Sequence, residues 1–91
     1  MTARIRRHVV VHGQVQGVYF RDSVRRLARE LGVSGWIRNR PDGAVEAALE
    51  GAPDAVERII EWSHQGPLGA RVDQVEVYEE QPSGETGFRV L

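Results

Sequence analysis

The spacing of hydrophobic and polar positions changes several times along the chain, and each change predicts a new element. Residues 5–12 hold three consecutive valines and precede Gly13, which is typical of a strand in the middle of a sheet. From Asp22 the apolar residues follow the i, i+3, i+4, i+7 spacing of one helix face, and Gly32 is placed to end that helix. We expect Asp22 or Ser23 to cap its start.

The middle of the chain predicts a β-hairpin. Residues 33–38 and 44–50 flank the turn sequence Asn-Arg-Pro-Asp-Gly at 39–43. The second arm alternates apolar residues with positions that include Glu46 and Glu50, so we expect one face of this hairpin to be exposed to solvent.

The remaining residues predict a second helix and two strands. Pro53 opens an apolar helical pattern that Gly66 ends, and residues 72–79 and 88–90 have strand character. The order β-α-β-β-α-β is that of the ferredoxin-like α+β sandwich, an antiparallel sheet of four to five strands with two helices on one face. With 91 residues, the chain is expected to form a single domain over 1–91.

Composition excludes several kinds of chemistry. The net charge of -1 gives no general attraction to nucleic acid or to an anionic membrane. All twelve basic residues are arginine and there is no cysteine, which rules out a lysine Schiff base, a disulfide, a thiolate zinc site and a cysteinyl-phosphate intermediate. The apolar run at 9–11 is too short for a signal peptide or a membrane span. We therefore expect a soluble, cytoplasmic protein, with a monomer as the default.

The loop at 13–21, which joins the first strand to the first helix, carries the most chemistry. Its backbone N–H groups and the positive end of the helix dipole point toward one place, and Arg21 adds a guanidinium that suits phosphoryl oxygens. Gly17 lets the backbone approach a ligand closely. The candidate phosphate cradle consists of the N–H groups of Gln16, Gly17, Val18, Tyr19 and Phe20.

The sequence Gly-Gln-Val-Gln-Gly-Val-Tyr-Phe-Arg at 13–21 resembles the first signature of the acylphosphatases. The stretch 35–51, with Gly-Trp-Ile-Arg-Asn at its start and Asp-Gly-Ala-Val at 42–45, is similar to the second. The resemblance covers nearly the whole chain and implies hydrolysis of acyl phosphates to a carboxylate and inorganic phosphate. It also implies that Arg21 binds the phosphoryl group and that Asn39 positions the attacking water. That these two side chains meet rests on the resemblance.

The residues themselves are compatible with these roles. The carboxylate leaving group of an acyl phosphate is weakly basic, so direct attack by water needs little acid catalysis. The amide of Asn39 can both donate to and accept from that water, and we expect the substrate phosphate to take the proton. No cofactor is implied, and nothing identifies a particular acyl group, so broad acyl tolerance is expected.

Other polar and aromatic residues have structural interpretations. No metal site is expected, because the histidines have no carboxylate at ligand spacing on their own elements and the pair Glu57 and Glu61 is typical of a solvated helix face. We interpret these histidines as structural: His8, His12 and His64. The aromatic residues predicted to form the core or pocket walls are Trp36, Trp62, Tyr19 and Phe20, of which Tyr19 could flank a substrate.

Two alternatives to a free-standing enzyme stay open. One is a non-catalytic ferredoxin-like module that binds an anion or a nucleotide; RNA is disfavoured because the first strand lacks aromatic residues for base stacking. The other is a domain of a larger carbamoyl-phosphate-processing protein. The complete predicted fold favours the free-standing enzyme.

Overall fold

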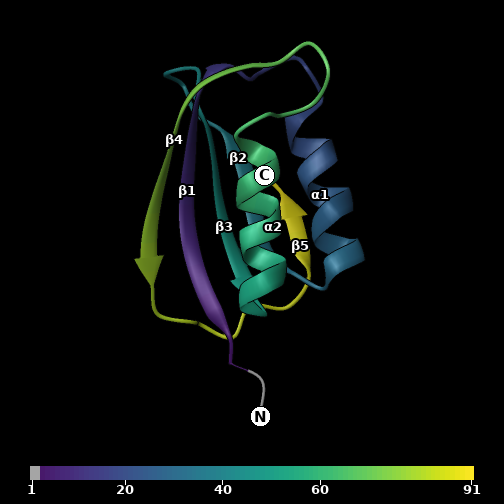
Figure 1. Ribbon diagram of the computed structural model, residues 1–91, viewed down its shortest axis with the longest axis vertical. Helices are drawn as coiled ribbons and strands as arrows, with labels where there is room; N and C mark the ends of the chain where they lie inside the picture. The colour runs from purple at the N-terminus through teal and green to yellow at the C-terminus, as the bar shows by residue number, and fades with distance from the viewer. Residues whose placement is uncertain (1–2) are drawn as a thin grey trace.

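The structure is a computed structural model that describes residues 3–91, and in it two helices cover one face of a five-stranded sheet (Figure 1). This confirms the predicted α+β order and the ferredoxin-like sandwich. No helix among residues 3–91 is long and apolar enough to span a membrane. The elements are β1 (Ile5–Gln14), α1 (Phe20–Leu31), β2 (Ser34–Asn39), β3 (Val45–Gly51), α2 (Pro53–Ser63), β4 (Arg71–Glu80) and β5 (Phe88–Val90).

The strands lie in the order β4-β1-β3-β2-β5, so β1 and β3 are neighbours at the centre. The prediction of a fully antiparallel sheet is wrong at one edge, because β5 pairs with β2 in parallel. The loop at 81–87 carries the chain across to the far edge instead of forming a hairpin with β4. The N–H group of Leu91 then donates to the carbonyl of Ile37 at 2.9 Å, which ties the end of the chain to β2.

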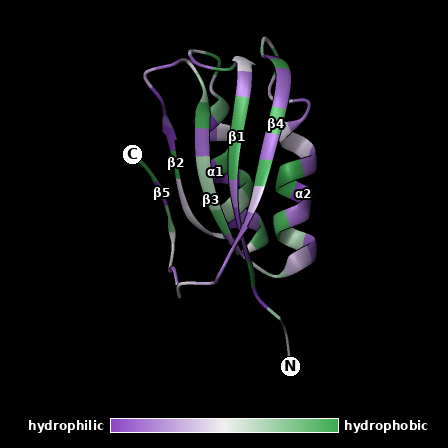
Figure 2. Cartoon of the chain, turned by 90° about the vertical axis from the view of Figure 1, so that its left-hand side faces the viewer, coloured by the Kyte–Doolittle hydropathy of each residue, from purple (hydrophilic) through white to green (hydrophobic). Residues whose placement is uncertain are grey.

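The core lies between the sheet and the two helices. Figure 2 shows hydrophobic residues in the middle of β1 and alternating hydrophobic and hydrophilic residues along β4, an edge strand. The core side chains are almost inaccessible, and each valine, leucine, isoleucine or phenylalanine among them contributes about 1.5–3 kcal/mol when fully buried. Representative members from β1, α1, α2 and β3 are Val9, Val11, Val24, Ala28, Val56, Ile59 and Leu49.

Helix α1 starts two residues before the predicted position. Tyr19 is the N-cap residue, with φ 64° and ψ 26°, and no side chain caps the helix. The prediction that Asp22 or Ser23 caps it is wrong: Asp22 pairs with Arg25 at 2.7 Å, and Ser23 Oγ donates to the carbonyl of Tyr19 at 2.9 Å. The predicted end is confirmed, because Gly32 adopts the left-handed conformation at the C-cap.

Strand β1 continues past its predicted end and contains a β-bulge. The register with β4 shifts between His12 and Gly13, and Gly13 has a φ of 132°. A Cβ atom at Gly13 would lie 2.1 Å from the carbonyl oxygen of Arg71, so glycine is required there. The bulge directs the end of β1 toward the loop that precedes α1.

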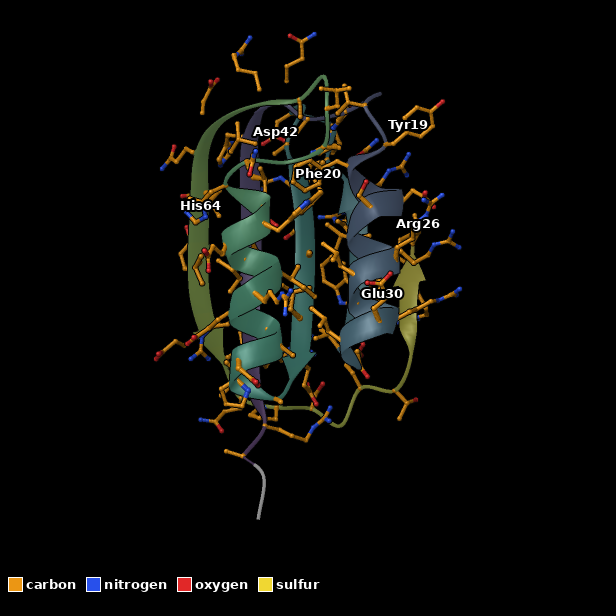
Figure 3. All side chains as sticks on the ribbon, turned by 45° about the vertical axis from the view of Figure 1, so that its right-hand side comes forward. Tyr19, Phe20, Arg26, Glu30, Asp42 and His64 are labelled. Carbon is orange, nitrogen blue, oxygen red and sulfur yellow. The ribbon has the colours of Figure 1, made fainter. Side chains whose placement is uncertain are left out.

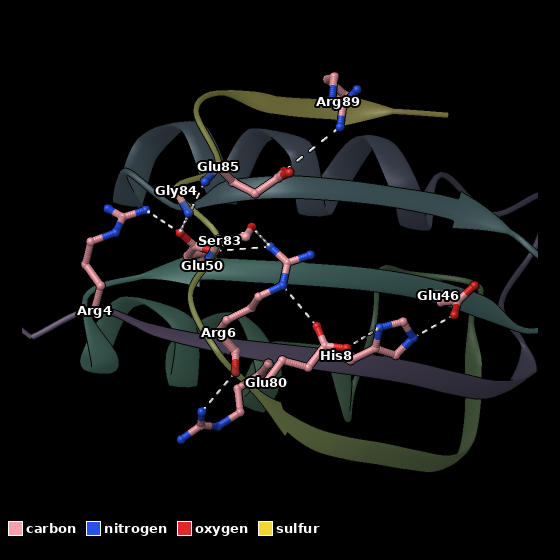
Figure 4. Close-up of polar contacts among 11 residues, drawn as sticks. Arg4, Arg6, His8, Glu46, Glu50, Glu80, Ser83, Gly84, Glu85 and Arg89 are labelled. Atoms are coloured by element: carbon pink, nitrogen blue, oxygen red, sulfur yellow. Dashed lines mark hydrogen bonds and ion pairs between the residues drawn. The ribbon is translucent and has the colours of Figure 1, made fainter.

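Glu50 on β3 contradicts the predicted solvent-exposed face, because its side chain is fully buried. Figure 4 shows how arginines near the start of β1 and the loop before β5 converge on its carboxylate. A buried charge needs such partners, and alternation along one strand does not reveal donors that come from elsewhere. The donors are Arg4 Nη2 (3.2 Å), Arg6 Nη1 (3.1 Å) and the N–H groups of Ser83 (2.9 Å), Gly84 (2.9 Å) and Glu85 (3.2 Å).

These contacts keep the Glu50 carboxylate charged. Burial by itself raises the pKa of a carboxyl group, because it disfavours the charged form. Here the hydrogen bonds from Ser83, Arg6 and Arg4 outweigh burial, and the pKa of Glu50 falls from its ordinary value of 4.5 to about 2. The charged carboxylate thereby fastens the loop at 81–87 to β3, and this loop leads into β5.

Glu50→Gln is expected to lower the free energy of unfolding at pH 7 by about 3 kcal/mol, because Arg4, Arg6 and the N–H groups of the loop at 81–87 then lose a buried charged acceptor. Since the folded-state pKa lies below the ordinary value, the stabilisation is complete above about pH 5 and is lost as the pH falls toward the folded-state pKa. The difference between wild type and variant, measured by urea denaturation, should therefore shrink between neutral pH and about pH 3.

Glu79→Gln is the matched control for this experiment. The Glu79 side chain is 84% exposed and lies 3.6 Å from Arg7, so its loss should cost less than about 1 kcal/mol. Equal losses of unfolding free energy in the two variants would contradict the conclusion that Glu50 fastens the loop at 81–87 to β3.

Candidate active site

The loop between β1 and α1 has the backbone geometry of an anion-binding nest. Gly17 has a φ of 75° and Tyr19 a φ of 64°, whereas Gln16 and Val18 have negative φ values. This alternation turns successive N–H groups toward one side of the loop. Among residues 3–91, no backbone carbonyl accepts a hydrogen bond from the N–H groups of residues 16–20. They stand at the N-terminus of α1, where the helix dipole also favours an anion.

A cleft of about 530 Å³ opens in front of this loop and brings the two predicted catalytic side chains, Arg21 and Asn39, together. Of the five residues predicted to form the phosphate cradle, Gly17, Tyr19 and Phe20 line the cleft. Gln16 and Val18 are not among its lining residues. The lining residues are Val15, Gly17, Tyr19, Phe20, Arg21, Asp22, Arg25, Asn39 and Val90.

Arg21 is the free cation of this cleft. It lies in the first turn of α1, is half-buried, and forms no ion pair with a carboxylate among residues 3–91. Arg25, on the same wall, is already paired with Asp22 at 2.7 Å, and Arg26 also contacts Asp22, at 3.1 Å. The Arg21 guanidinium therefore keeps its full donor capacity for a ligand.

Asn39 ends β2 and lines the cleft. Its Oδ1 atom is buried and has no hydrogen-bond partner among the described residues. A buried acceptor without a donor costs about 1–3 kcal/mol, and such orphaned atoms are rare enough in native proteins to suggest a role. The amide is thus suited to take a hydrogen bond from a molecule in the cleft.

The turn that follows β2 is held by hydrogen bonds, which help to position Asn39. The N–H group of Arg40 donates to the carbonyl of Ala44 at 2.8 Å. Asp42 Oδ1 accepts from the N–H group of Ala44 at 3.1 Å, and Asp42 Oδ2 accepts from Arg40 Nη2 at 2.8 Å. The bond from Ala44 is the main cause that lowers the pKa of the Asp42 carboxyl, and Arg40 adds to it.

Gln16 joins this turn to the nest loop. Its Nε2 atom donates to the carbonyl of Arg40 at 2.8 Å and to that of Ala44 at 3.0 Å. The side chain therefore holds together the loop that precedes Arg21 and the turn that follows Asn39. Sequence reasoning missed this contact, because both acceptors are backbone atoms more than twenty residues away.

The histidines lie outside the lining of the cleft. His8 Nε2 lies 2.6 Å from Glu46 Oε2, and His12 Nε2 lies 2.7 Å from Glu76 Oε2, so their carboxylate partners come from neighbouring strands. His64 Nδ1 is 3.0 Å from the carbonyl of Ile60 within α2. Within residues 3–91, no three His, Asp or Glu side chains are placed to hold a metal ion.

The aromatic residues divide between core and surface. Phe20 is buried and packs on Trp62 of α2, with ring centroids 5.3 Å apart. Trp36 is half-buried beside His8 at 5.9 Å. Tyr19 is 83% exposed and projects from the start of α1 in Figure 3, so it belongs to the wall of the cleft and not to the core.

The fold and the cleft together define a class: a ferredoxin-like α+β domain with an anion-binding nest, a free arginine and an amide in one cleft. The profile of the acylphosphatase family matches residues 7–90. The chain belongs to the acylphosphatase family and is a hydrolase that acts on acyl phosphates.

Individual relatives are similar over nearly their whole length. An acylphosphatase of Thermococcus kodakarensis is 57% identical over 88 residues, which is 97% of each chain. One from Gloeobacter violaceus is 54% identical over 91 residues, 100% of this chain and 98% of the relative. The structure of an acylphosphatase from Coxiella burnetii superposes with a TM-score of 0.92 at 40% identity, covering 97% of this chain and 93% of that one.

Proposed function

We propose that this cleft hydrolyses acyl phosphates by direct attack of water on phosphorus. Arg21 and the N–H groups of residues 16–20 hold the phosphoryl group, and Asn39 positions the water. The observation that carries the proposal is that one cleft is lined both by Arg21, which no carboxylate among residues 3–91 neutralises, and by Asn39, whose Oδ1 atom has no hydrogen-bond partner there. Inorganic phosphate is then both a product and a ligand of the same site.

The protein's part in this reaction is positioning and charge stabilisation. As the oxygen of water forms its bond to phosphorus, the bond from phosphorus to the acyl oxygen breaks and the carboxylate leaves with that electron pair. Charge on the equatorial phosphoryl oxygens is met by the Arg21 guanidinium and by fixed N–H dipoles. Because these donors are held by the loop and by the first turn of α1 before a substrate binds, little reorganisation is needed during the reaction.

The proton of the attacking water goes to a phosphoryl oxygen of the substrate. Asp22 is the one carboxylate among the lining residues, and it is engaged by Arg25 and Arg26. An amide such as that of Asn39 accepts a hydrogen bond from water but does not take its proton. The site therefore supplies orientation, and the substrate supplies the base.

A non-catalytic anion-binding module would need the nest and Arg21 but would have no use for Asn39. The unpartnered Oδ1 atom of this cleft-lining residue thus favours hydrolysis over simple binding. A monomeric state, a cytoplasmic location and the absence of a nucleic-acid partner stay predictions of the sequence.

The position of bond cleavage tests the direct attack. Benzoyl phosphate hydrolysed in ¹⁸O-labelled water should give labelled phosphate and unlabelled benzoate, because water attacks phosphorus. Label in benzoate would show attack on the acyl carbon and overturn the proposed roles. Incubation of unlabelled phosphate with the protein in the same water controls for exchange after the reaction.

A further inference from the structure

We infer that Tyr19 and Val90 form an acyl-binding wall of the cleft, and that the protein prefers acyl phosphates with an aromatic or bulky apolar acyl group over small ones. This inference rests on the proposed function and assigns the substrate class that the cleft selects. It replaces the broad acyl tolerance expected from the sequence.

Tyr19 is an exposed aromatic residue on a backbone that disfavours it. It is the one non-glycine residue among residues 3–91 with a positive φ, and its side chain is 83% exposed. Residues with a Cβ atom are rare in this conformation, where glycine or asparagine is preferred. The anion-binding nest requires the left-handed backbone conformation at position 19, but it does not require an aromatic side chain there. Figure 3 shows the ring projecting outward from the start of α1, clear of the core.

Val90 brings a second apolar surface to the same cleft. It lies on β5 opposite Ile37 of β2, the strand that ends at Asn39. Its side chain is 42% exposed although it is held by strand pairing. Two of the exposed large hydrophobic side chains among residues 3–91, Tyr19 and Val90, therefore line this one cleft.

The division of the cleft into a charged part and an apolar part matches the two halves of an acyl phosphate. Arg21 and the nest serve the phosphoryl half, and the apolar lining residues Tyr19 and Val90 are left for the acyl half. The volume of about 530 Å³ lies in the range of sites that hold drug-sized ligands, and a phosphoryl group alone fills little of it.

The test compares kcat/KM for benzoyl phosphate with kcat/KM for acetyl phosphate in variants of both residues. In Tyr19→Asn, which keeps the N–H group and tolerates the left-handed backbone, the ratio of benzoyl to acetyl should fall about three- to tenfold, mainly through KM. Tyr19→Phe keeps the ring and should keep the ratio. Thermal unfolding should show Tyr19→Asn at least as stable as wild type, which excludes misfolding as the cause.

Val90→Ala should lower the same ratio about threefold, because apolar contact area is lost. Val77→Ala is its matched control, since Val77 is also 42% exposed and lies on β4, the opposite edge strand. An unchanged ratio in Tyr19→Asn, or an equal fall in Val90→Ala and Val77→Ala, would overturn the inference. Failure of the wild type to hydrolyse either substrate would instead refute the proposed function, so the two failures are distinguishable.

Discussion

Arg21→Ala is expected to lower kcat/KM for benzoyl phosphate by about 10³-fold or more and to abolish measurable phosphate binding. Arg21 is the cation in the cleft that no carboxylate among residues 3–91 neutralises, and the remaining donors are backbone dipoles. The loss should appear in binding and in turnover together, because the guanidinium contacts the phosphoryl group in both the ground state and the transition state.

Initial rates and calorimetric titration with inorganic phosphate measure this effect. Arg29→Ala is the matched control: Arg29 lies on the same helix, in its last turn, is exposed, and also forms no ion pair within the described residues. It should retain near-normal turnover and phosphate affinity. An Arg21→Ala variant that keeps near-normal turnover would remove Arg21 from the site.

Asn39→Ala is expected to lower kcat by about 10²- to 10³-fold while inorganic phosphate still binds. In the proposed mechanism the amide contacts the attacking water and not the phosphoryl group. Its removal should therefore slow the chemical step and leave phosphate binding nearly intact. Phosphate titration of the variant, set beside its turnover, separates the two roles.

A conservative variant sharpens this second experiment. Asn39→Ser keeps a short side chain that donates and accepts, and it should recover part of the rate lost in Asn39→Ala. If phosphate binding fails in Asn39→Ala while the protein remains folded, Asn39 belongs to the phosphate cradle and the attacking water is held by another group.

The regular part of the fold could be predicted from the sequence, because periodicity reports which face of an element is buried. The spacing from Val24 to Leu31 and the glycine at position 32 defined most of α1. The start of α1 could not be predicted, since Tyr19 caps it through its backbone conformation and not through a side chain. The parallel pairing of β5 could not be predicted either, because three residues give no information on direction.

The burial of the Glu50 carboxylate could not be predicted from the alternation of polar and apolar residues either. Alternation along β3 placed Glu50 on a face expected to meet solvent, whereas donors from the start of β1 and from the loop at 81–87 bury it. Such donors are distant in sequence, so only the folded chain reveals them. Ala48, also fully buried on that face, shows the same limit.

The part of the candidate site that is contiguous in the sequence could be predicted. The nest and Arg21 lie in one segment whose glycine spacing and helix junction indicate an anion site. The meeting of Asn39 with Arg21 depends on how β2 is placed in the sheet, so the sequence supported it only through family resemblance. The contacts of Gln16 with the turn and the arrival of Val90 at the cleft come from the tertiary structure alone.

The most direct test of the proposed catalytic roles is hydrolysis of benzoyl phosphate by the purified protein in excess chelator, with Arg21→Ala and Asn39→Ala beside it. We expect rapid turnover by the wild type alone, phosphate binding by the wild type and Asn39→Ala, and neither by Arg21→Ala. A folded wild type that binds phosphate but leaves benzoyl phosphate intact, or that regains turnover only when a divalent ion is returned, would contradict these roles.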